Sequence, residues 1–234
     1  MKKIILASTS TLYKENYLAY LMNPLEVFFK DVQEILFIPY ARPSGITHDK
    51  YTEVVNTAFA KINKKVTGIH QSPDPVMAIK NAKAVFTGGG NTFVLTSALY
   101  REGLMEVLRN KVLSGMPYLG TSAGSNIGGL TMQTTNDMPI MYPPSFKTMG
   151  LVPFNINAHY LDPDPKSRHN GETRETRIKE FHEFNTPPVI GLREGSWLEI
   201  QGKEIILRGI LHARIFEKGK APYEQSPGTH IRVK

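Results

Sequence analysis

The fold is decided by one stretch, Met116-Pro117-Tyr118-Leu119-Gly120-Thr121-Ser122-Ala123-Gly124, in which a strand-like run enters a Gly-x-Ser-x-Gly pentapeptide. The residues that follow are small and competent to form a helix. A sharp strand-to-helix turn of this kind holds the middle serine in a strained backbone geometry and exposes its hydroxyl. The flanking glycines leave room for neighbouring backbone, and the helix N-terminus can stabilise negative charge. Ser122 is therefore a candidate nucleophile, although a plain helix N-cap serine occurs in the same local pattern.

Outward from this stretch, short apolar runs alternate with longer helical patterns. Strands are expected over 3–7, 34–39, 66–70, 84–87 and 116–120, helices over 11–22, 47–62 and 75–81, and one long or two short helices over 91–113. This alternation predicts βαβ units, and strands without polar alternation are typical of a sheet covered on both faces. The predicted class is α/β, with a mostly parallel, doubly wound sheet.

The pattern changes after about residue 135, where prolines punctuate a loop-rich stretch. One more helix is predicted over 172–184, and short strands over 189–191, 196–201, 204–207 and 213–216. Because no repeat, low-complexity tract or linker separates two units, residues 1–234 are predicted to form a single domain.

Composition removes several classes of protein. The 234 residues contain no cysteine, which excludes a disulfide framework, a thiolate metal site and a cysteine nucleophile. Lys and Arg outnumber Asp and Glu by 28 to 21, a net charge of +7, but they are spread along the whole chain. No nucleic-acid-binding motif is present. We therefore expect no nucleic-acid partner, whereas a mildly basic protein suits an acidic small substrate.

The sequence also bears on location and on metals. The apolar run at 4–7 is shorter than a signal peptide requires, and no stretch approaches the roughly 18 apolar residues of a membrane span. We expect a cytoplasmic protein without a membrane partner. His182-Glu183-Phe184-Asn185-Thr186 begins like a zinc-binding His-Glu-x-x-His motif, but Thr186 replaces the second histidine, so no metal site is predicted.

A second glycine-rich segment, Gly88-Gly89-Gly90-Asn91-Thr92, also lies between a predicted strand and a predicted helix. Its spacing fits neither the dinucleotide fingerprint nor the phosphate-binding P-loop. Adjacent strand ends converge at the carboxyl edge of such a sheet, so these amides could lie near Ser122 and form an oxyanion hole. Two alternatives stay open: a structural turn, and a non-catalytic phosphate- or nucleotide-binding module.

A serine nucleophile needs a base, and seven histidines are candidates. His159 follows Asn155-Ile156-Asn157-Ala158, a short strand-like run that ends in a loop, where catalytic groups gather. Spacing alone does not select it from the others, which are His48, His70, His169, His182, His212 and His230.

Five segments together resemble the peptidase E family of aspartyl dipeptidases, which are serine peptidases. They occur in the order 88–93, 120–124, 135–140, 171–174 and 191–197, and the resemblance covers nearly the whole chain. It implies a class I glutamine amidotransferase-like (flavodoxin-like) fold, and hydrolysis of dipeptides that begin with an unblocked aspartate. It implies no cofactor. A small Asp-X peptide is the expected partner, and the chain is expected to be a monomer or a small homo-oligomer.

The resemblance also assigns roles to residues. Ser122 matches the nucleophile and His159 the general base, with backbone N–H groups of Gly89 and Ala123 in the oxyanion hole. Two acids, Asp137 and Glu194, match family motifs and are alternatives for the third member of the triad. The acid that the triad does not use could bind the α-ammonium group of the substrate.

Substrate selectivity needs a cation for the aspartate side chain. Arg174 is the predicted carboxylate-binding residue, because a guanidinium pairs with a carboxylate through a planar fork. Asn91 is the second predicted substrate contact, and Arg42 and Arg193 are weaker candidates for the cation. The Thr121-Ser122-Ala123-Gly124 segment also resembles the cyanophycinases, which cleave β-aspartyl-arginine units. A β-aspartyl peptidase is therefore an alternative to the aspartyl dipeptidase, and a nearer one than the non-catalytic binding module.

Overall fold

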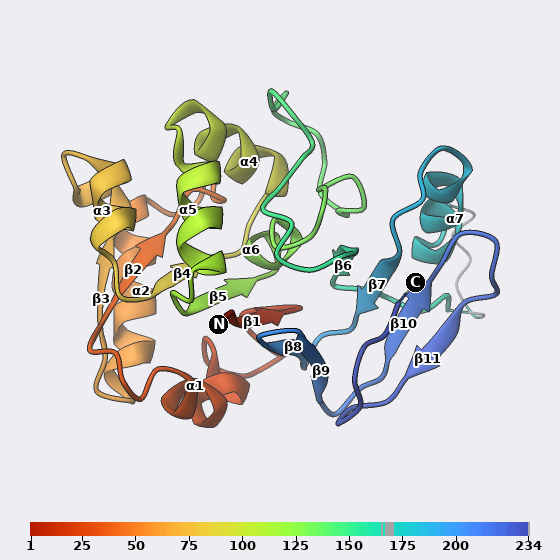
Figure 1. Ribbon diagram of the computed structural model, residues 1–234, viewed down its shortest axis with the longest axis horizontal. Coiled ribbons are helices and arrows are strands. Elements are labelled where there is room, and N and C mark those ends of the chain that lie inside the picture. The colour runs from red at the N-terminus through yellow and green to blue at the C-terminus, as the bar shows by residue number, and fades with distance from the viewer. Residues whose placement is uncertain (165, 167–170, 234) are drawn as a thin grey trace.

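The computed structural model describes residues 1–164, 166 and 171–233, and its larger sheet has seven strands in the order β3-β2-β4-β5-β1-β8-β9 (Figure 1). The strands are β1 (Lys3–Ala7), β2 (Glu34–Ile38), β3 (Lys65–Gly68), β4 (Val85–Thr87), β5 (Tyr118–Thr121), β8 (Ser196–Gln201) and β9 (Glu204–Gly209). The first five are parallel to one another, whereas β8 and β9 extend the sheet with antiparallel pairing. The predicted α/β class with a mostly parallel sheet is confirmed.

Helices cover both faces of this sheet. The helices are α1 (Met22–Phe28), α2 (His48–Ala60), α3 (Pro75–Asn81), α4 (Thr92–Arg101), α5 (Leu104–Leu113) and the short α6 (Ala123–Asn126). Buried residues of α1 and α2 form one hydrophobic core with the sheet, and those of α3, α4 and α5 belong to another. Local sequence sets the starts of two of them, because the side chains of Thr47 and Asp74 cap the N-termini of α2 and α3.

A second, four-stranded sheet has the order β11-β10-β7-β6. It consists of β6 (Asn155–Ala158), β7 (Val189–Leu192), β10 (Ala213–Phe216) and β11 (Tyr223–Gln225), with helix α7 (Arg174–Phe184) against it. Only β6 and β7 pair in parallel. One core cluster contains buried residues of both sheets, including Leu6 of β1 and Ile190 of β7. The C-terminal strands therefore divide between two sheets that share a core.

The expected helix over 11–22 is wrong. Lys14 and Leu18 adopt φ values of 63° and 58°, which lie in the left-handed region and interrupt a right-handed helix. A short 3-10 turn η1 (Ala19–Leu21) precedes α1, which accommodates Pro24 in its first turn. The segment 91–113, expected to hold one long or two short helices, holds two, because Gly103 divides it into α4 and α5 with a φ of 66°. Across the described ranges, no helix is long and apolar enough to cross a membrane.

Candidate active site

Ser122 occupies the turn between β5 and α6, with φ 52° and ψ −112°. A non-glycine residue in the left-handed region is strained. This is the strained geometry that the Gly-x-Ser-x-Gly pattern predicts for the serine. The glycines two positions before and after it, Gly120 and Gly124, are sterically required. A Cβ on Gly120 would lie 2.4 Å from the carbonyl oxygen of Gly124, and one on Gly124 would lie 2.1 Å from that of Thr87. The turn is therefore packed so tightly that only glycine fits on either side of the serine.

His159 lies beside Ser122, directly after β6. Its Nε2 is 2.8 Å from Ser122 Oγ, although the two residues follow strands of different sheets. The other ring nitrogen, Nδ1, is 2.5 Å from Oε1 of Glu194. With both nitrogens engaged, the imidazole bridges a hydroxyl and a carboxylate.

Glu194 belongs to the turn that connects β7 of the small sheet to β8 of the large one. The N–H of Ser196 donates to the carbonyl of Arg193 at 3.1 Å, and Gly195 has a φ of 87°. Glycine is favoured there because this φ is costly for other residues. The turn thus presents Glu194 toward His159 from the junction of the two sheets.

Asp137, the other predicted acid, is placed at the N-terminus of α4. Its Oδ2 accepts hydrogen bonds from the N–H of Thr92 at 2.7 Å, from the Thr92 hydroxyl at 2.5 Å and from the Thr135 hydroxyl at 2.9 Å. Within the described chain, it makes no hydrogen bond to His159. Of the two acids, the structure brings Glu194 alone to the histidine.

The glycine-rich loop packs directly against the serine. A Cβ on Gly89 would lie 3.1 Å from Ser122 Cβ, so the backbone of Gly89 is in contact with the nucleophile turn. The N–H groups of Gly88 and Asn91 donate to the carbonyls of Ile38 and Ala41, and they are not free for an anion. The N–H groups of Gly89 and Ala123 donate to no described residue. The loop therefore offers a local anion site at Ser122 rather than a broad phosphate cradle.

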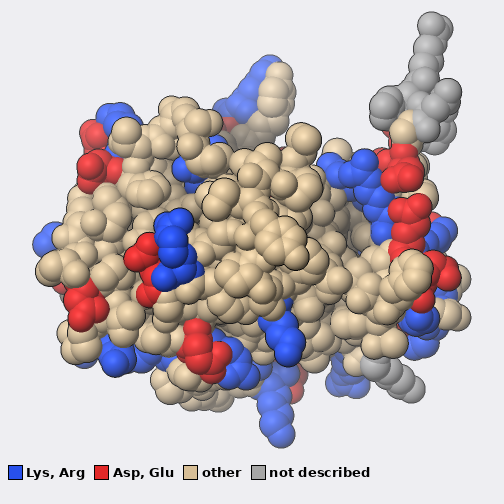
Figure 2. Space-filling view, turned by 90° about the horizontal axis from the view of Figure 1, so that it is seen from above, with Lys and Arg blue, Asp and Glu red and all other residues tan. Residues whose placement is uncertain are grey.

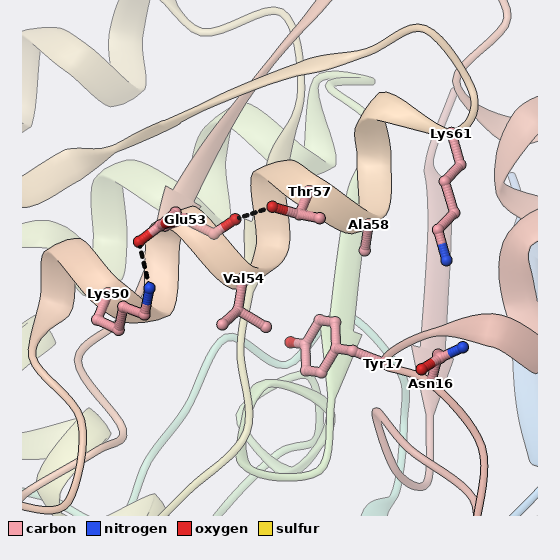
Figure 3. Close-up of a pocket in the computed structure, with 8 residues that line it drawn as sticks. All are labelled: Asn16, Tyr17, Lys50, Glu53, Val54, Thr57, Ala58 and Lys61. Atoms are coloured by element: carbon pink, nitrogen blue, oxygen red, sulfur yellow. Dashed lines mark hydrogen bonds and ion pairs between the residues drawn. The ribbon is translucent and has the colours of Figure 1, made fainter.

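Tyr51 supports this loop through a hydrogen bond and is itself contacted by Tyr17. The hydroxyl of Tyr51 donates to the Gly89 carbonyl at 3.2 Å and lies 3.3 Å from the hydroxyl of Tyr17. Tyr17 also borders a hollow of about 310 Å³ beside α2 (Figure 3). None of the eight predicted site residues lines that hollow, so it is not part of the Ser122 site.

Asn91 has a structural task in the fold. Its Oδ1 accepts from the N–H of Val94 and caps α4, and its Nδ2 donates to the carbonyl of Met138 at 2.9 Å. Both ends of the amide are thus engaged within the protein. Its predicted substrate contact would require one of these bonds to open.

Arg174 is the first residue of α7 and is half-buried. Its guanidinium makes no hydrogen bond or ion pair with another residue of the described segments. Burial lowers the pKa of this guanidinium, the Arg177 charge acts in the same direction, and Asp137 opposes both. Arg174 also lines a hollow of about 380 Å³ with Asp162, the third residue after His159. Among the described residues, Arg174 is thus a partly desolvated cation without an ion-pair partner, on the wall of a hollow that it shares with Asp162.

Arg193, by contrast, is fully engaged. Its guanidinium binds Asp162 at 2.6 Å, Glu224 at 2.8 Å and the carbonyl of His212 at 2.6 Å. The Arg193 hydrogen bonds hold the pKa of the Asp162 and Glu224 carboxyls below their usual range. Arg193 therefore ties the segment after His159 to β11 and is not free to bind a substrate. Arg42 is exposed and lies over the ring of Tyr51 at 5.3 Å.

Charge is mixed on the face seen in Figure 2. Acidic and basic side chains alternate along the end of the molecule that carries β10, β11 and α7, and the middle of that face is largely uncharged. No group of three His, Asp or Glu side chains suited to a metal ion occurs among the described residues. His169, one of the candidate bases, lies outside the described residues.

Sequence reasoning missed the residues that hold this site together. Ser8, Thr92 and Thr135 all make side-chain hydrogen bonds to candidate site residues or to their backbone. One signal for Ser8 was present, because it directly follows the predicted first strand at the carboxyl edge of the sheet. The sequence does not, however, show which groups a serine hydroxyl bonds.

Comparisons with known proteins identify the family of this chain. The model of peptidase family S51 matches residues 4–208. Peptidase E of Streptomyces coelicolor is 48% identical over 228 residues, which cover 97% of this chain and 93% of the relative. The probable alpha-aspartyl dipeptidase of Drosophila melanogaster is 45% identical over 229 residues, which cover 97% and 94%.

Solved structures show the same fold at lower identity. A peptidase from an acI-B1 Actinobacterium has a TM-score of 0.74 at 17% identity and covers 100% of this chain and 97% of its own. A putative peptidase E from Listeria monocytogenes EGD-e has a TM-score of 0.66 at 22% identity, with coverage of 90% and 100%. Because the family model matches most of the chain and the Streptomyces and Drosophila relatives are 48% and 45% identical to it, the protein belongs to peptidase family S51 and is a peptidase.

Proposed function

We propose that this peptidase is a serine-type dipeptidase that hydrolyses peptides with an unblocked N-terminal aspartate. The observation that carries the proposal is the continuous chain from Ser122 Oγ through His159 to the Glu194 carboxylate, with contacts of 2.8 and 2.5 Å. A hydroxyl, an imidazole and a carboxylate in this order form the arrangement that activates serine in many unrelated hydrolases.

The proposed reaction begins with acylation. His159 Nε2 takes the proton of Ser122 Oγ as that oxygen attacks the peptide carbonyl carbon. The N–H groups of Gly89 and Ala123 stabilise the negative charge on the carbonyl oxygen. His159 then gives its proton to the leaving nitrogen, the C–N bond breaks and the second residue departs as a free amine.

Deacylation repeats these steps with water. His159 removes a proton from water, the resulting hydroxide attacks the acyl carbon, and the proton returns to Ser122 Oγ as the ester bond breaks. Glu194 accepts the Nδ1 hydrogen bond throughout and stabilises the imidazolium. This assigns Glu194 the third position and leaves Asp137 outside the triad.

Arg174 is the proposed partner of the aspartate side chain. Its guanidinium is half-buried and has no partner in the described protein, so a substrate carboxylate would relieve an unpaired charge. Asp137 influences the pKa of Arg174, and its Oδ1 has no hydrogen bond with a described residue. We assign the α-ammonium group of the substrate to this carboxylate. The two names among the relatives, peptidase E and probable alpha-aspartyl dipeptidase, support an aspartyl substrate.

A substrate panel tests the proposal. Wild-type protein should release aspartate from Asp-Leu and much less product from Glu-Leu, N-acetyl-Asp-Leu and β-Asp-Arg. Ser122→Ala should reduce kcat on Asp-Leu by about 10⁴–10⁶-fold. An unchanged rate in that variant would end the serine mechanism, and a preference for β-Asp-Arg would favour the cyanophycinase-like alternative.

A further inference from the structure

Ser8 lies where the two sheets meet, one residue after the end of β1. Its side chain is completely buried. The backbone N–H of Ser8 donates to the carbonyl of Ser196 at 3.1 Å, next to the pairing of Ala7 with Trp197 between β1 and β8. Ser8 therefore touches the start of β8, directly after the turn that carries Glu194.

The Ser8 hydroxyl reaches the other two segments of the active site. Its Oγ accepts a hydrogen bond from the backbone N–H of His159 at 2.9 Å and donates one to the carbonyl of Leu192 at 2.7 Å. A hydroxyl has a single donor hydrogen, so this one is fully committed. Leu192 and Ser196 flank Glu194 on either side, and one buried residue thus binds the backbone of the base and both ends of the turn that carries the acid.

His159 needs such support because its backbone is strained. Its φ of 55° lies in the left-handed region, which a non-glycine residue occupies only when its surroundings fix it there. If the Ser8 hydroxyl is absent, the His159 N–H loses its acceptor in a partly buried setting, and the backbone can relax. The imidazole cannot shift with the backbone and keep its contacts, because its two nitrogens must reach Ser122 and Glu194 at 2.8 and 2.5 Å.

We propose that Ser8 is a positioning residue of the active site, whose hydroxyl fixes the backbone of His159 against the Glu194 turn. The inference rests on the proposed function, since it takes His159 as the base and Glu194 as its partner. The competing account is that Ser8 makes ordinary core hydrogen bonds, which affect stability alone.

The test compares Ser8→Ala with Ile79→Val, a core truncation in α3 beneath a different part of the large sheet. Both are assayed on Asp-Leu well below their melting temperatures. Proton NMR follows the downfield resonance of the His159 Nδ1 hydrogen, identified by its loss in Glu194→Gln. If Ser8→Ala does not fold, Ser8→Cys replaces it, because a thiol keeps the side chain but bonds weakly.

We expect Ser8→Ala to lower kcat by about 10–100-fold with KM within about twofold, because small misplacements of catalytic groups carry losses of this size. The downfield resonance should move upfield or broaden. Ile79→Val should keep both properties even if its melting temperature falls as much.

Three results would overturn the inference: a kcat within twofold of wild type, an unchanged resonance, or equal kcat losses in the two variants. Failure of the proposed function is distinguishable, because it would show as activity in Ser122→Ala. The resonance would still report in that case whether Ser8 positions His159.

Discussion

His159 Nε2 lies 2.8 Å from Ser122 Oγ, although Ser122 follows a strand of the seven-stranded sheet and His159 follows a strand of the four-stranded one. The contact exists because the two sheets share a hydrophobic core and are joined by the turn that carries Glu194.

The two acids should respond differently to amide substitution. Glu194→Gln should lower kcat by about 10⁴-fold, because an amide cannot stabilise the imidazolium and can favour the wrong tautomer. Asp137→Asn should mainly raise KM and lower the melting temperature, since its carboxylate accepts hydrogen bonds at the start of α4. Steady-state kinetics and thermal melts distinguish these effects. The reverse pattern would assign Asp137 to the triad.

Gly89→Ala tests the anion site. Its added methyl would lie 3.1 Å from Ser122 Cβ, which is tight enough to displace the loop and its N–H group. Loss of one oxyanion donor typically lowers kcat by about 10²-fold, and KM should change little. Gly45→Ala is a control for glycine replacement: the position is open but its φ of 80° strains alanine, so the melting temperature should fall while kcat stays at the wild-type value. A Gly89→Ala enzyme with wild-type kcat would remove this loop from the mechanism.

Arg174→Ala should reduce selectivity for aspartate. The ratio of kcat/KM for Asp-Leu to that for Ala-Leu should fall by about 10–100-fold, the range expected for charge-assisted hydrogen bonds to a carboxylate. Arg177→Ala, on the same helix and near Glu172 at 3.6 Å, is the matched control and should keep the ratio. A ratio that survives Arg174→Ala would show that another group binds the side chain.

The absence of cysteine permits a clean chemical test. Iodoacetamide should leave the wild-type activity unchanged, whereas Ser122→Cys would carry the single thiol of the chain. His159 should favour its thiolate, so labelling should be faster than in Ser44→Cys, at an exposed position. Intact-mass measurements give both rates. Equal rates, or no slowing after an added His159→Ala, would argue against proton transfer between these residues.

Acid stability should depend on Arg193. The pKa values of Asp162 and Glu224 are lowered in the folded protein, chiefly by hydrogen bonds from Arg193. A lowered carboxyl pKa stabilises the fold above the unfolded value, and that contribution is lost as pH falls through the folded pKa. The melting temperature should therefore drop as pH decreases below about 4, and Arg193→Met should flatten this dependence. An identical slope in the variant would show that the pairing adds nothing to stability.

Local sequence predicted the parts of the site that depend on local sterics. The glycines around Ser122 are needed by the turn itself, so the pentapeptide could be recognised without any tertiary information. The choice between Asp137 and Glu194 could not be made in this way, because it depends on how the two sheets meet. The same is true of Ser8, whose partners lie about 150 and 184 positions away.

The fold was predictable where strands are buried and apolar, and less so elsewhere. The parallel strands β1 to β5 appear close to their expected ranges. The segment 11–22 has apolar residues at helical spacing, but Lys14 and Leu18 adopt left-handed conformations that spacing does not reveal. Strand β11 is short and only partly buried, and its pairing with β10 rather than its own pattern makes it a strand.

The division of the reacting groups between two sheets has a consequence for how this enzyme acquires activity. Neither sheet alone carries both the nucleophile and its base, so a folding intermediate with only the parallel sheet formed would be inert. Contacts between segments far apart in the chain form slowly, because loop closure must precede them. Recovery of peptidase activity after dilution from denaturant should therefore lag behind the recovery of secondary structure. The rate at which activity returns then reports how fast the second sheet docks.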